Sequence, residues 1–418
     1  MPGFEDLLAG VHLPFHPDLV IPELHPVSLP QPEVSPVEDI AAAAEASVRA
    51  TFAGTVTPGM TIAVGAGSRG LTGRVEMLAG VVAGLRALGA SPFIVPAMGS
   101  HGGATADGQR QVLSDYGITE ASVGAEIRST METVVVATTP DGMPLYLDLN
   151  AAGADRIFPV NRIKPHTCFV GPIESGLCKM AVVGFGKQPG AAQIHSCGPE
   201  AMRDRLLAGI AALKGTGRIL GGLATIESGA GEVVRVASLH GANLGAEREL
   251  ELTNLAKTLV APLPFAEIDV LIVEKVGKDI SGVGMDPNVT GRYWIHGLPG
   301  DTRVSNIVVL GLTEASHGNA LGIGLADFIT TDVARQIDWP TTYVNCFTAG
   351  PAGVRRSRMP MVMPTEHDAI MAALSMCGRG VLQTKRVVRI RSTLHLTDMW
   401  VSDALLPEAL AIGATVRT

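Results

Sequence analysis

The chain has 418 residues, of which 46% are hydrophobic and 17% charged, a balance typical of a folded protein with a large core. Its net charge is −8, its aromatic content is 4%, and no window is rich in Lys or Arg, which excludes nucleic-acid binding through a basic face. The longest charge-free runs, 50–68 and 87–106, are interrupted by Pro, Gly, Ser or Thr and predict no membrane span. The five cysteines form no CxxC pair, and acids occupy the start of the chain, so we expect a cytoplasmic protein without a disulfide framework.

The first forty residues contain eight prolines and predict an extended arm. Beyond the arm, apolar runs alternate with helical patterns, which indicates βαβ units and a parallel sheet. The expected elements are helix 37–51, strand 60–66, helix 71–89, strand 91–97 and helix 105–116. One apolar stripe of the helix at 71–89 consists of Val75, Leu78, Val82, Leu85 and Leu88. Its other face carries Arg74 and Glu76.

Three further strands are expected at 133–139, 144–150 and 155–163, and the turn Pro140–Gly142 predicts a hairpin between the first two. Two helices follow at 199–214 and 245–259. Pro262 and Pro264 then interrupt the chain before a new strand, so we expect domains at 1–265 and 266–418. In the second domain we expect strands at 267–277, 304–312, 341–346 and 385–393 and a helix at 366–378. The predicted fold class is α/β, with two lobes, mainly parallel sheets and an active-site cleft between the lobes.

Three polar stretches stand out in the first lobe. VGAGSRG places Arg69 after a strand and a glycine turn, where anions bind well, and PAMGSHGGAT places His101 in a glycine-rich loop. The stretch from 161 to 198 gathers Lys164, His166, Glu174, Lys179, Lys187 and His195 among apolar and small residues. An apolar neighbourhood favours a reactive amine at Lys179, because a buried lysine must be paired or have a lowered pKa. A surface arginine, a solvated loop histidine and a solvated lysine are the alternative interpretations.

These motifs, in this order and together with VGKDISGVGMDPNVTGR at 276–292, resemble the lactate racemase family of nickel-pincer-nucleotide enzymes. The resemblance implies a covalent cofactor, pyridinium-3,5-bisthiocarboxylic acid mononucleotide nickel, made by separate cofactor-synthesis enzymes. It makes Lys179 the tethering lysine and His195 the nickel ligand. His101 and His166 become the two acid/base histidines. It assigns substrate binding to Arg69 in the first lobe, and Lys278 and Arg292 are the candidates in the second, beside Asp279 and Asn288.

The implied activity is that of an isomerase, a racemase or epimerase that acts on a small 2-hydroxy acid. Removing the α-hydrogen as hydride while histidine takes the hydroxyl proton gives a neutral 2-keto acid and avoids a second negative charge beside the carboxylate. An alternative is a hydrolase or lyase with a divalent metal on His101, His166 and His195, although no HxH or HExxH spacing supports it. A non-catalytic binding homologue is another. A dinucleotide oxidoreductase is disfavoured because the first strand is not followed by a GxGxxG with an acid about twenty residues further on.

Overall fold

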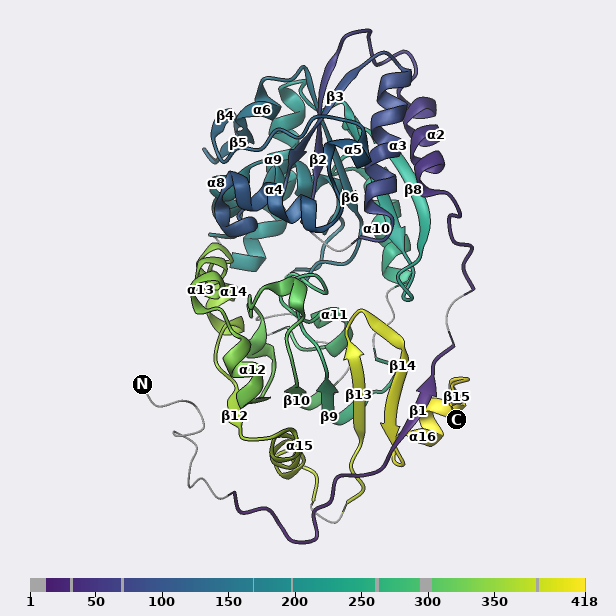
Figure 1. Cartoon of the computed structure of the whole chain (residues 1–418), viewed down its shortest axis with the longest axis vertical. Coiled ribbons are helices and arrows are strands. Elements are labelled where there is room, and N and C mark those ends of the chain that lie inside the picture. The colour runs from purple at the N-terminus through teal and green to yellow at the C-terminus, as the bar shows by residue number, and fades with distance from the viewer. Residues whose placement is uncertain are drawn as a thin grey trace. The chain divides into compact units, whose positions relative to one another are not determined.

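The computed structural model describes residues 13–30, 33–68, 71–167, 169–196, 198–259, 263–293, 303–380 and 383–417. They divide into two compact units, each of α/β architecture with a mainly parallel sheet, which confirms the predicted α/β class and its mainly parallel sheets (Figure 1). We call the described residues within Glu33–Val260 and Thr348–Pro351 the N-terminal unit. The C-terminal unit contains those within Met1–Pro32, Ala261–Phe347 and Ala352–Thr418. Within the described ranges, no helix has the length and apolar character needed to cross a membrane.

The N-terminal unit is built on a five-stranded sheet in the order β3-β2-β6-β7-β8. The strands β3, β2, β6 and β7 pair in parallel, and β8 pairs with β7 in antiparallel orientation. A separate antiparallel hairpin, β4–β5, confirms the turn predicted at 140–142. The strand bounds are β2 (Thr61–Ala66), β3 (Ser91–Pro96), β4 (Thr133–Thr138), β5 (Pro144–Asp148), β6 (Arg156–Arg162), β7 (Gly221–Glu227) and β8 (Val233–His240).

Helices cover both faces of this sheet. One buried cluster packs the outer helices against Ile62 and Val64 of β2, and the other packs against Ala63. This alternation arises because successive strand residues point to opposite faces. The helices are α2 (Ile40–Phe52), α3 (Arg74–Ala87), α4 (Ala106–Asp115), α5 (Glu120–Val123), α6 (Leu149–Ala152), α7 (Leu177–Lys179), the π-helix η2 (Met180–Gly184), α8 (Lys187–His195), α9 (Gly198–Gly215) and α10 (Glu247–Leu259).

Helices α2 and α3 lie side by side on one face (Figure 1), at a separation that only glycine permits. A Cβ atom added at Gly80 of α3 would lie 2.2 Å from the carbonyl oxygen of Ala41. We therefore expect Gly80→Ala to push the two helices apart.

The C-terminal unit contains an eight-stranded sheet in the order β12-β11-β10-β9-β13-β14-β1-β15. The strands from β12 to β13 are parallel, and the last three pairings are antiparallel. The strand bounds are β1 (Leu24–Ser28), β9 (Glu267–Val273), β10 (Arg303–Val309), β11 (Phe328–Thr330), β12 (Met361–Met363), β13 (Val387–Ser392), β14 (His395–Ser402) and β15 (Thr415–Val416). Its helices are α11 (Pro287–Thr290), α12 (Thr331–Gln336), α13 (Trp339–Thr348), α14 (Pro351–Arg356), α15 (Glu366–Ser375) and α16 (Leu406–Ala411).

The proline-rich arm differs from its predicted place in the first domain. Its strand β1 pairs with β14 along Leu24–Ser28 and with β15 at Val27 and Ser28, so it belongs to the C-terminal sheet. The side chain of Val27 is fully buried in that unit's core. Burial of apolar side chains and ladder hydrogen bonds over five residues therefore hold the arm there.

The strand predicted at 341–346 is wrong, because these residues lie inside helix α13. Their β-branched and aromatic side chains favour a strand by propensity. Thr342, Asn345 and Cys346 are nevertheless buried at helical spacing, and the side chain of Asp338 accepts a hydrogen bond from the N–H of Thr341 at 2.7 Å. Packing at positions i, i+3 and i+4 together with this cap at the start outweighs the strand propensity.

Candidate active site

The predicted site residues of the N-terminal unit follow the carboxyl ends of neighbouring parallel strands. Ala66 at the end of β2 pairs with Pro96 at the end of β3, and Gly65 pairs with Pro159 of β6. The loops that carry His101 and His166 therefore leave the same edge of one sheet. Open α/β sheets bind ligands at this edge.

His166 and Lys179 form the closest pair among the predicted residues. Nζ of Lys179 lies 2.6 Å from Nε2 of His166, and the imidazole is 4% exposed. Its ring stacks on Phe169 with a centroid distance of 4.3 Å. A lysine ammonium can only donate a hydrogen bond, so while Lys179 is charged Nε2 accepts and the ring proton is on Nδ1. The pair joins an amine to an imidazole that can exchange a proton.

The loop that carries His166 is held by Glu174, whose side chain is almost fully buried. One carboxylate oxygen accepts from the N–H of His166 at 2.6 Å, and the other accepts from the N–H of Gly171 at 3.1 Å. Lys257 of α10 completes the arrangement at 2.6 Å from the Glu174 carboxylate. Glu174 therefore positions the His166 backbone, and its charge is compensated by Lys257.

The segment from Lys179 to His195 is helical throughout most of its length but changes pitch directly after Lys179. The carbonyl oxygen of Met180 accepts from the N–H of Phe185 at 3.0 Å, the spacing of a π-helix. π-Helical turns recur at functional sites. At the end of α8, Nδ1 of His195 donates to the carbonyl oxygen of Ala191 at 2.6 Å. A carbonyl only accepts, so the neutral ring carries its proton on Nδ1 and its lone pair on Nε2.

A buried carboxylate fixes the start of this segment. Glu249 of α10 is fully buried and accepts hydrogen bonds from the N–H groups of Cys178 at 3.0 Å and Gly245 at 2.7 Å. Burial raises the pKa of Glu249, and these backbone hydrogen bonds act in the opposite direction. Cys178 is also buried, which raises the pKa of its thiol well above the ordinary value. Cys178 therefore belongs to the packing beneath Lys179.

The loop of His101 is tied to the same segment through Gln109 and Lys187. Nε2 of Gln109 donates to the carbonyl oxygens of Gly99 at 2.8 Å and His101 at 3.2 Å. Its Oε1 accepts from Nζ of Lys187 at 2.8 Å, and the N–H of Gly99 donates to Gly184 at 3.2 Å. These contacts hold the His101 loop against the π-helix and α8.

Lys187 is fully buried and pairs with Asp148, which is also fully buried, at 3.0 Å. Burial lowers the pKa of Lys187 and raises the pKa of Asp148, and in each case the partner's charge acts in the opposite direction. A lysine enclosed in this way anchors the loop and is a poor candidate for a tether.

Arg74 is a residue that sequence reasoning missed. The prediction that it lies on the face of α3 opposite the apolar stripe is wrong, since it is 8% exposed. Its guanidinium carbon lies 3.5 Å from the centroid of the Tyr116 ring, a cation–π contact that the sequence pattern of α3 alone does not reveal. Arg69, predicted as the carboxylate clamp, lies outside the described residues.

Lys278 and Arg292 of the C-terminal unit are held at different places along its strands. Lys278 follows the carboxyl end of β9 and donates to the carbonyl oxygen of Gly282 at 2.9 Å. Arg292 donates to Val304 at 2.9 Å and Ser305 at 2.8 Å in the amino-terminal half of β10. It also pairs with Asp327. The structure does not bring the two together, and their substrate roles stay predictions.

The remaining candidates of that segment bond to their neighbours. The carboxylate of Asp279 accepts from the hydroxyl of Thr313 at 2.5 Å, and Asn288 donates to Asp286 at 2.8 Å. In the part of the chain that the structure describes, no group of three or more His, Cys, Asp or Glu side chains could hold a metal ion.

Comparison with known proteins gives distant likenesses. The lactate racemase apoprotein from Thermoanaerobacterium thermosaccharolyticum is 12% identical with a TM-score of 0.49, over 89% of this chain and 99% of that one. A Thermotoga maritima protein, solved by crystallography, is 13% identical with a TM-score of 0.47, over 64% of this chain and 69% of that one. No family model and no curated protein matches the chain. The case for a function therefore depends on the residues of the site.

Proposed function

We propose that the protein racemises or epimerises a 2-hydroxy acid by removing and returning a hydride, with a 2-keto acid as the transient species. The observation that carries this proposal is the Lys179–His166 pair, 2.6 Å apart at the carboxyl edge of the sheet. The order of the motifs around Arg69, His101, His166, Lys179 and His195 supports it, through their resemblance to the lactate racemase family.

The donor set of the Lys179–His195 segment fits the covalent nickel-pincer nucleotide that this chemistry implies. Lys179 is half-buried and supplies the amine for a tether. His195 supplies an imidazole whose Nδ1 is already fixed by Ala191, so that Nε2 is the nitrogen suited to a metal. When bound, such a group accepts the hydride and gives it back, and nickel suits its sulfur donors together with one imidazole.

The chain's own residues handle the protons. His166 takes the hydroxyl proton of one enantiomer as that carbon becomes a keto carbon, and His101 does the same for the other enantiomer. When the hydride returns to the other face of the keto acid, the other histidine, which starts protonated, gives its proton to the new hydroxyl, and proton exchange with solvent then restores both histidines. An imidazole has a suitable affinity for protons in both directions near neutral pH. The fixed backbones of His166 and His101, held by Glu174 and Gln109, keep the two bases oriented.

The tether and the nickel ligand are tested by mass and metal content. Protein co-expressed with the cofactor-synthesis enzymes should carry a covalent, cofactor-sized mass increment on Lys179, and Lys179→Ala should lose it. His195→Ala should lower the nickel content of the purified protein. An undiminished increment in Lys179→Ala would overturn the assignment.

The reaction is tested with the loaded enzyme in deuterium oxide. We expect the α-hydrogen to be retained in the product, because a hydride held on a cofactor does not exchange with solvent. His166→Gln should lower kcat/KM for both directions of racemisation by about 10²- to 10⁴-fold, the usual contribution of an acid/base group, because the same histidine is the base in one direction and the acid in the other. His240→Gln, an exposed histidine of the same unit, is the matched control and should keep the rate. Rapid uptake of solvent deuterium would instead indicate proton abstraction.

A further inference from the structure

Lys179 and Lys187 lie on one helical segment but differ in the groups that their amines contact. Lys187 pairs with the carboxylate of Asp148 at 3.0 Å. A carboxylate stabilises the charged ammonium, which has no lone pair and does not attack an acyl carbon. The amine of Lys179 instead lies 2.6 Å from Nε2 of His166. An imidazole at this distance can take a proton from an amine as the amine forms a new bond.

The imidazole of His166 is held in the orientation that this contact needs. The residue is 4% exposed, and its ring stacks on Phe169 with a centroid distance of 4.3 Å and an angle of 24° between the planes. The carboxylate of Glu174 accepts a hydrogen bond from its backbone N–H at 2.6 Å. Ring and backbone are therefore both fixed before the two nitrogens react.

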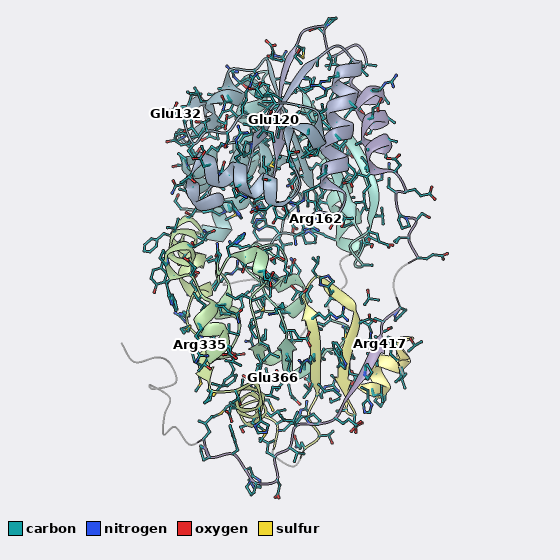
Figure 2. All side chains as sticks on the ribbon, viewed as in Figure 1. Glu120, Glu132, Arg162, Arg335, Glu366 and Arg417 are labelled. Carbon is teal, nitrogen blue, oxygen red and sulfur yellow. The ribbon has the colours of Figure 1, made fainter. Side chains whose placement is uncertain are left out.

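The loop that carries His166 is also closed at its base. Arg162, labelled in Figure 2, ends β6 and pairs with Glu227 at the end of β7. The N–H of Lys164 then donates to the carbonyl oxygen of Ser175 at 3.0 Å, and the N–H of Ser175 donates to that of Lys164 at 3.2 Å. The loop thus leaves and rejoins the unit at one fixed point.

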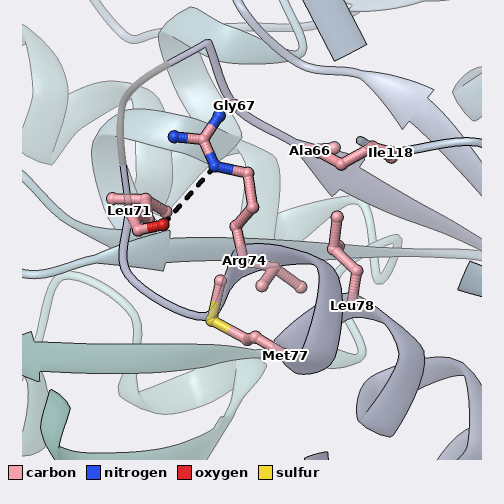
Figure 3. A pocket seen from close by; sticks show the side chains of 8 residues that line it. Ala66, Gly67, Leu71, Arg74, Met77, Leu78 and Ile118 are labelled. Atoms are coloured by element: carbon pink, nitrogen blue, oxygen red, sulfur yellow. Dashed lines mark hydrogen bonds between the residues drawn. The ribbon is translucent and has the colours of Figure 1, made fainter. Parts of the chain in front are cut away.

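An acyl group must reach Lys179 from the solvent-accessible side of this half-buried residue. The pocket drawn in Figure 3, which we call the Arg74 pocket, borders the residue that follows Lys179. A Cβ atom added at Gly67, which lines the pocket, would lie 3.1 Å from Cε of Met180. The Arg74 pocket has room for about one water molecule, so it is too small to hold an acyl group.

We propose that the chain acylates itself at Lys179, with His166 as the general base. The neutral amine attacks the carbon of a thiocarboxylic acid in its C=S, O–H form, a C–N bond forms, and Nε2 of His166 takes a proton from the nitrogen. The C–O bond then breaks, and the hydroxyl leaves as water with that proton. An amine and a thiocarboxylic acid thus give a thioamide and one water, and nothing is oxidised or reduced. The identity of the acyl group rests on the proposed function, whereas the reactivity of the amine does not.

This step allows His166 to act twice. Before acylation, the ammonium of Lys179 occupies Nε2. Acylation removes the charge of that nitrogen and two of its three donors. Nε2 is then available for the hydroxyl proton of a 2-hydroxy acid, so formation of the tether prepares the base for the proposed reaction.

The test uses the full chain without cofactor and phenyl acetate as the acyl donor. Peptide mass spectrometry after short exposures at neutral pH measures the acetylation rates of Lys179 and, in the same sample, of the exposed Lys275. An exposed lysine without a base is almost entirely protonated at this pH. We therefore expect Lys179 to react at least tenfold faster than Lys275, and His166→Gln to remove this excess without changing the Lys275 rate. His240→Gln, which removes an exposed histidine from the same unit, is the matched control and should keep the excess.

A second variant separates the loss of a base from the loss of the fold. Circular dichroism compares the folding of His166→Gln with that of the unmodified chain. Phe169→Leu keeps the imidazole but removes the ring on which it stacks, so the Lys179 rate should fall and stay above that of His166→Gln. Equal rates for Lys179 and Lys275 in the unmodified chain, or an unchanged Lys179 rate in both variants, would overturn the proposal.

The covalent increment of the co-expressed chain separates this result from the proposed function. An increment on Lys179 that forms to a smaller extent in His166→Gln supports self-acylation, and racemisation rates of this variant are then expressed per tethered chain. An increment on Lys179 without excess reactivity overturns self-acylation and leaves the proposed tether in place. Excess reactivity that depends on His166, without any increment, supports His166 as the base and contradicts the tether.

Discussion

In the N-terminal unit, the strands β2, β3 and β6 end in loops that carry His101, His166 and the Arg74 pocket, whereas the corresponding loops of the C-terminal unit bond mainly to themselves. There, Lys278 donates to Gly282, and Asp279 accepts from Thr313. Both sheets are mainly parallel and covered on both faces. The sheet architecture alone therefore does not create a site.

The C-terminal unit also buries charged side chains, among them Asp269, Arg356 and Lys385, so the difference lies in which backbone segments the buried charges hold. The N-terminal unit buries Lys187 with Asp148, Glu174 and Glu249 under the backbone segments that carry the candidate residues. Each of these charges is costly to bury unless it is paired or bonded to N–H groups. We infer that these buried charges fix the loops of the site. Substitutions of the buried side chains therefore test the comparison.

The largest expected effect is that of Lys187→Met. It leaves Asp148 buried without its partner, and breaking such a pair costs about 3–5 kcal/mol in the free energy of unfolding. Chemical denaturation of the full chain, followed by circular dichroism, measures this loss. Asp148→Asn added to Lys187→Met should recover part of it by removing the buried charge.

Arg335→Met provides the control from the C-terminal unit. Its ion pair with Asp332 joins two exposed side chains, and such a pair contributes at most about 1 kcal/mol. A loss for Lys187→Met no larger than that of this control would show that the buried pair does not support the His101 loop.

Arg292→Met should have the next largest effect. The guanidinium bonds to Val304, Ser305 and Leu325. Removing it takes this donor from the partly buried carbonyl oxygens of Val304 and Leu325 and leaves Asp327 without its ion-pair partner, which should cost about 2–3 kcal/mol of stability. We expect the KM of the loaded enzyme for its hydroxy acid to stay unchanged. A raised KM with unchanged stability would instead support the substrate role predicted for Arg292 from the sequence. The C-terminal unit would then also contribute a substrate-binding residue.

The two units also differ in how far the sequence predicts them. The strands before His101 and His166 follow from apolar runs ended by glycine or proline, and glycine is required at Gly102. Its φ is +65°, and an added Cβ would lie 2.5 Å from the backbone of Gly108. The sequence thus places both histidines at the ends of strands, which the structure confirms.

Other features depend on contacts between residues distant in the chain. Glu249 bonds to Cys178, 71 positions earlier, and Lys187 bonds to Gln109, 78 positions earlier. Arg74 is buried because Tyr116 at the end of α4 covers it. The helical period does place Arg74 on the stripe of Leu78, Val82 and Leu85, because it lies four, eight and eleven positions before them, so its predicted place on the other face is a misreading of the pattern. The contact with Tyr116 cannot be read from the helix alone.

The smallest expected effect is a change in the pH dependence of stability in Glu249→Gln. Burial raises the pKa of Glu249, so the folded chain holds this proton at pH values where the unfolded chain, with a pKa of about 4.3, has lost it. The stability linked to this group is fully present at low pH and is lost as pH rises through the folded pKa. Glutamine cannot ionise, so Glu249→Gln does not lose stability in this way as pH rises. Its amide nitrogen is a donor and faces the N–H group of Cys178 or Gly245, which lowers the stability of the variant at every pH.

We therefore expect the unmodified chain to exceed Glu249→Gln in stability most at low pH, with the difference narrowing as pH rises toward 7. Denaturation at a series of pH values, with Glu251→Gln as the control for removing a carboxylate from the same helix, measures this trend. A difference that widens as pH rises would mean that the N–H groups of Cys178 and Gly245 stabilise an ionised Glu249. Glu249 would then stay charged at every pH tested. Its negative charge would favour the protonated form of the Lys179 amine.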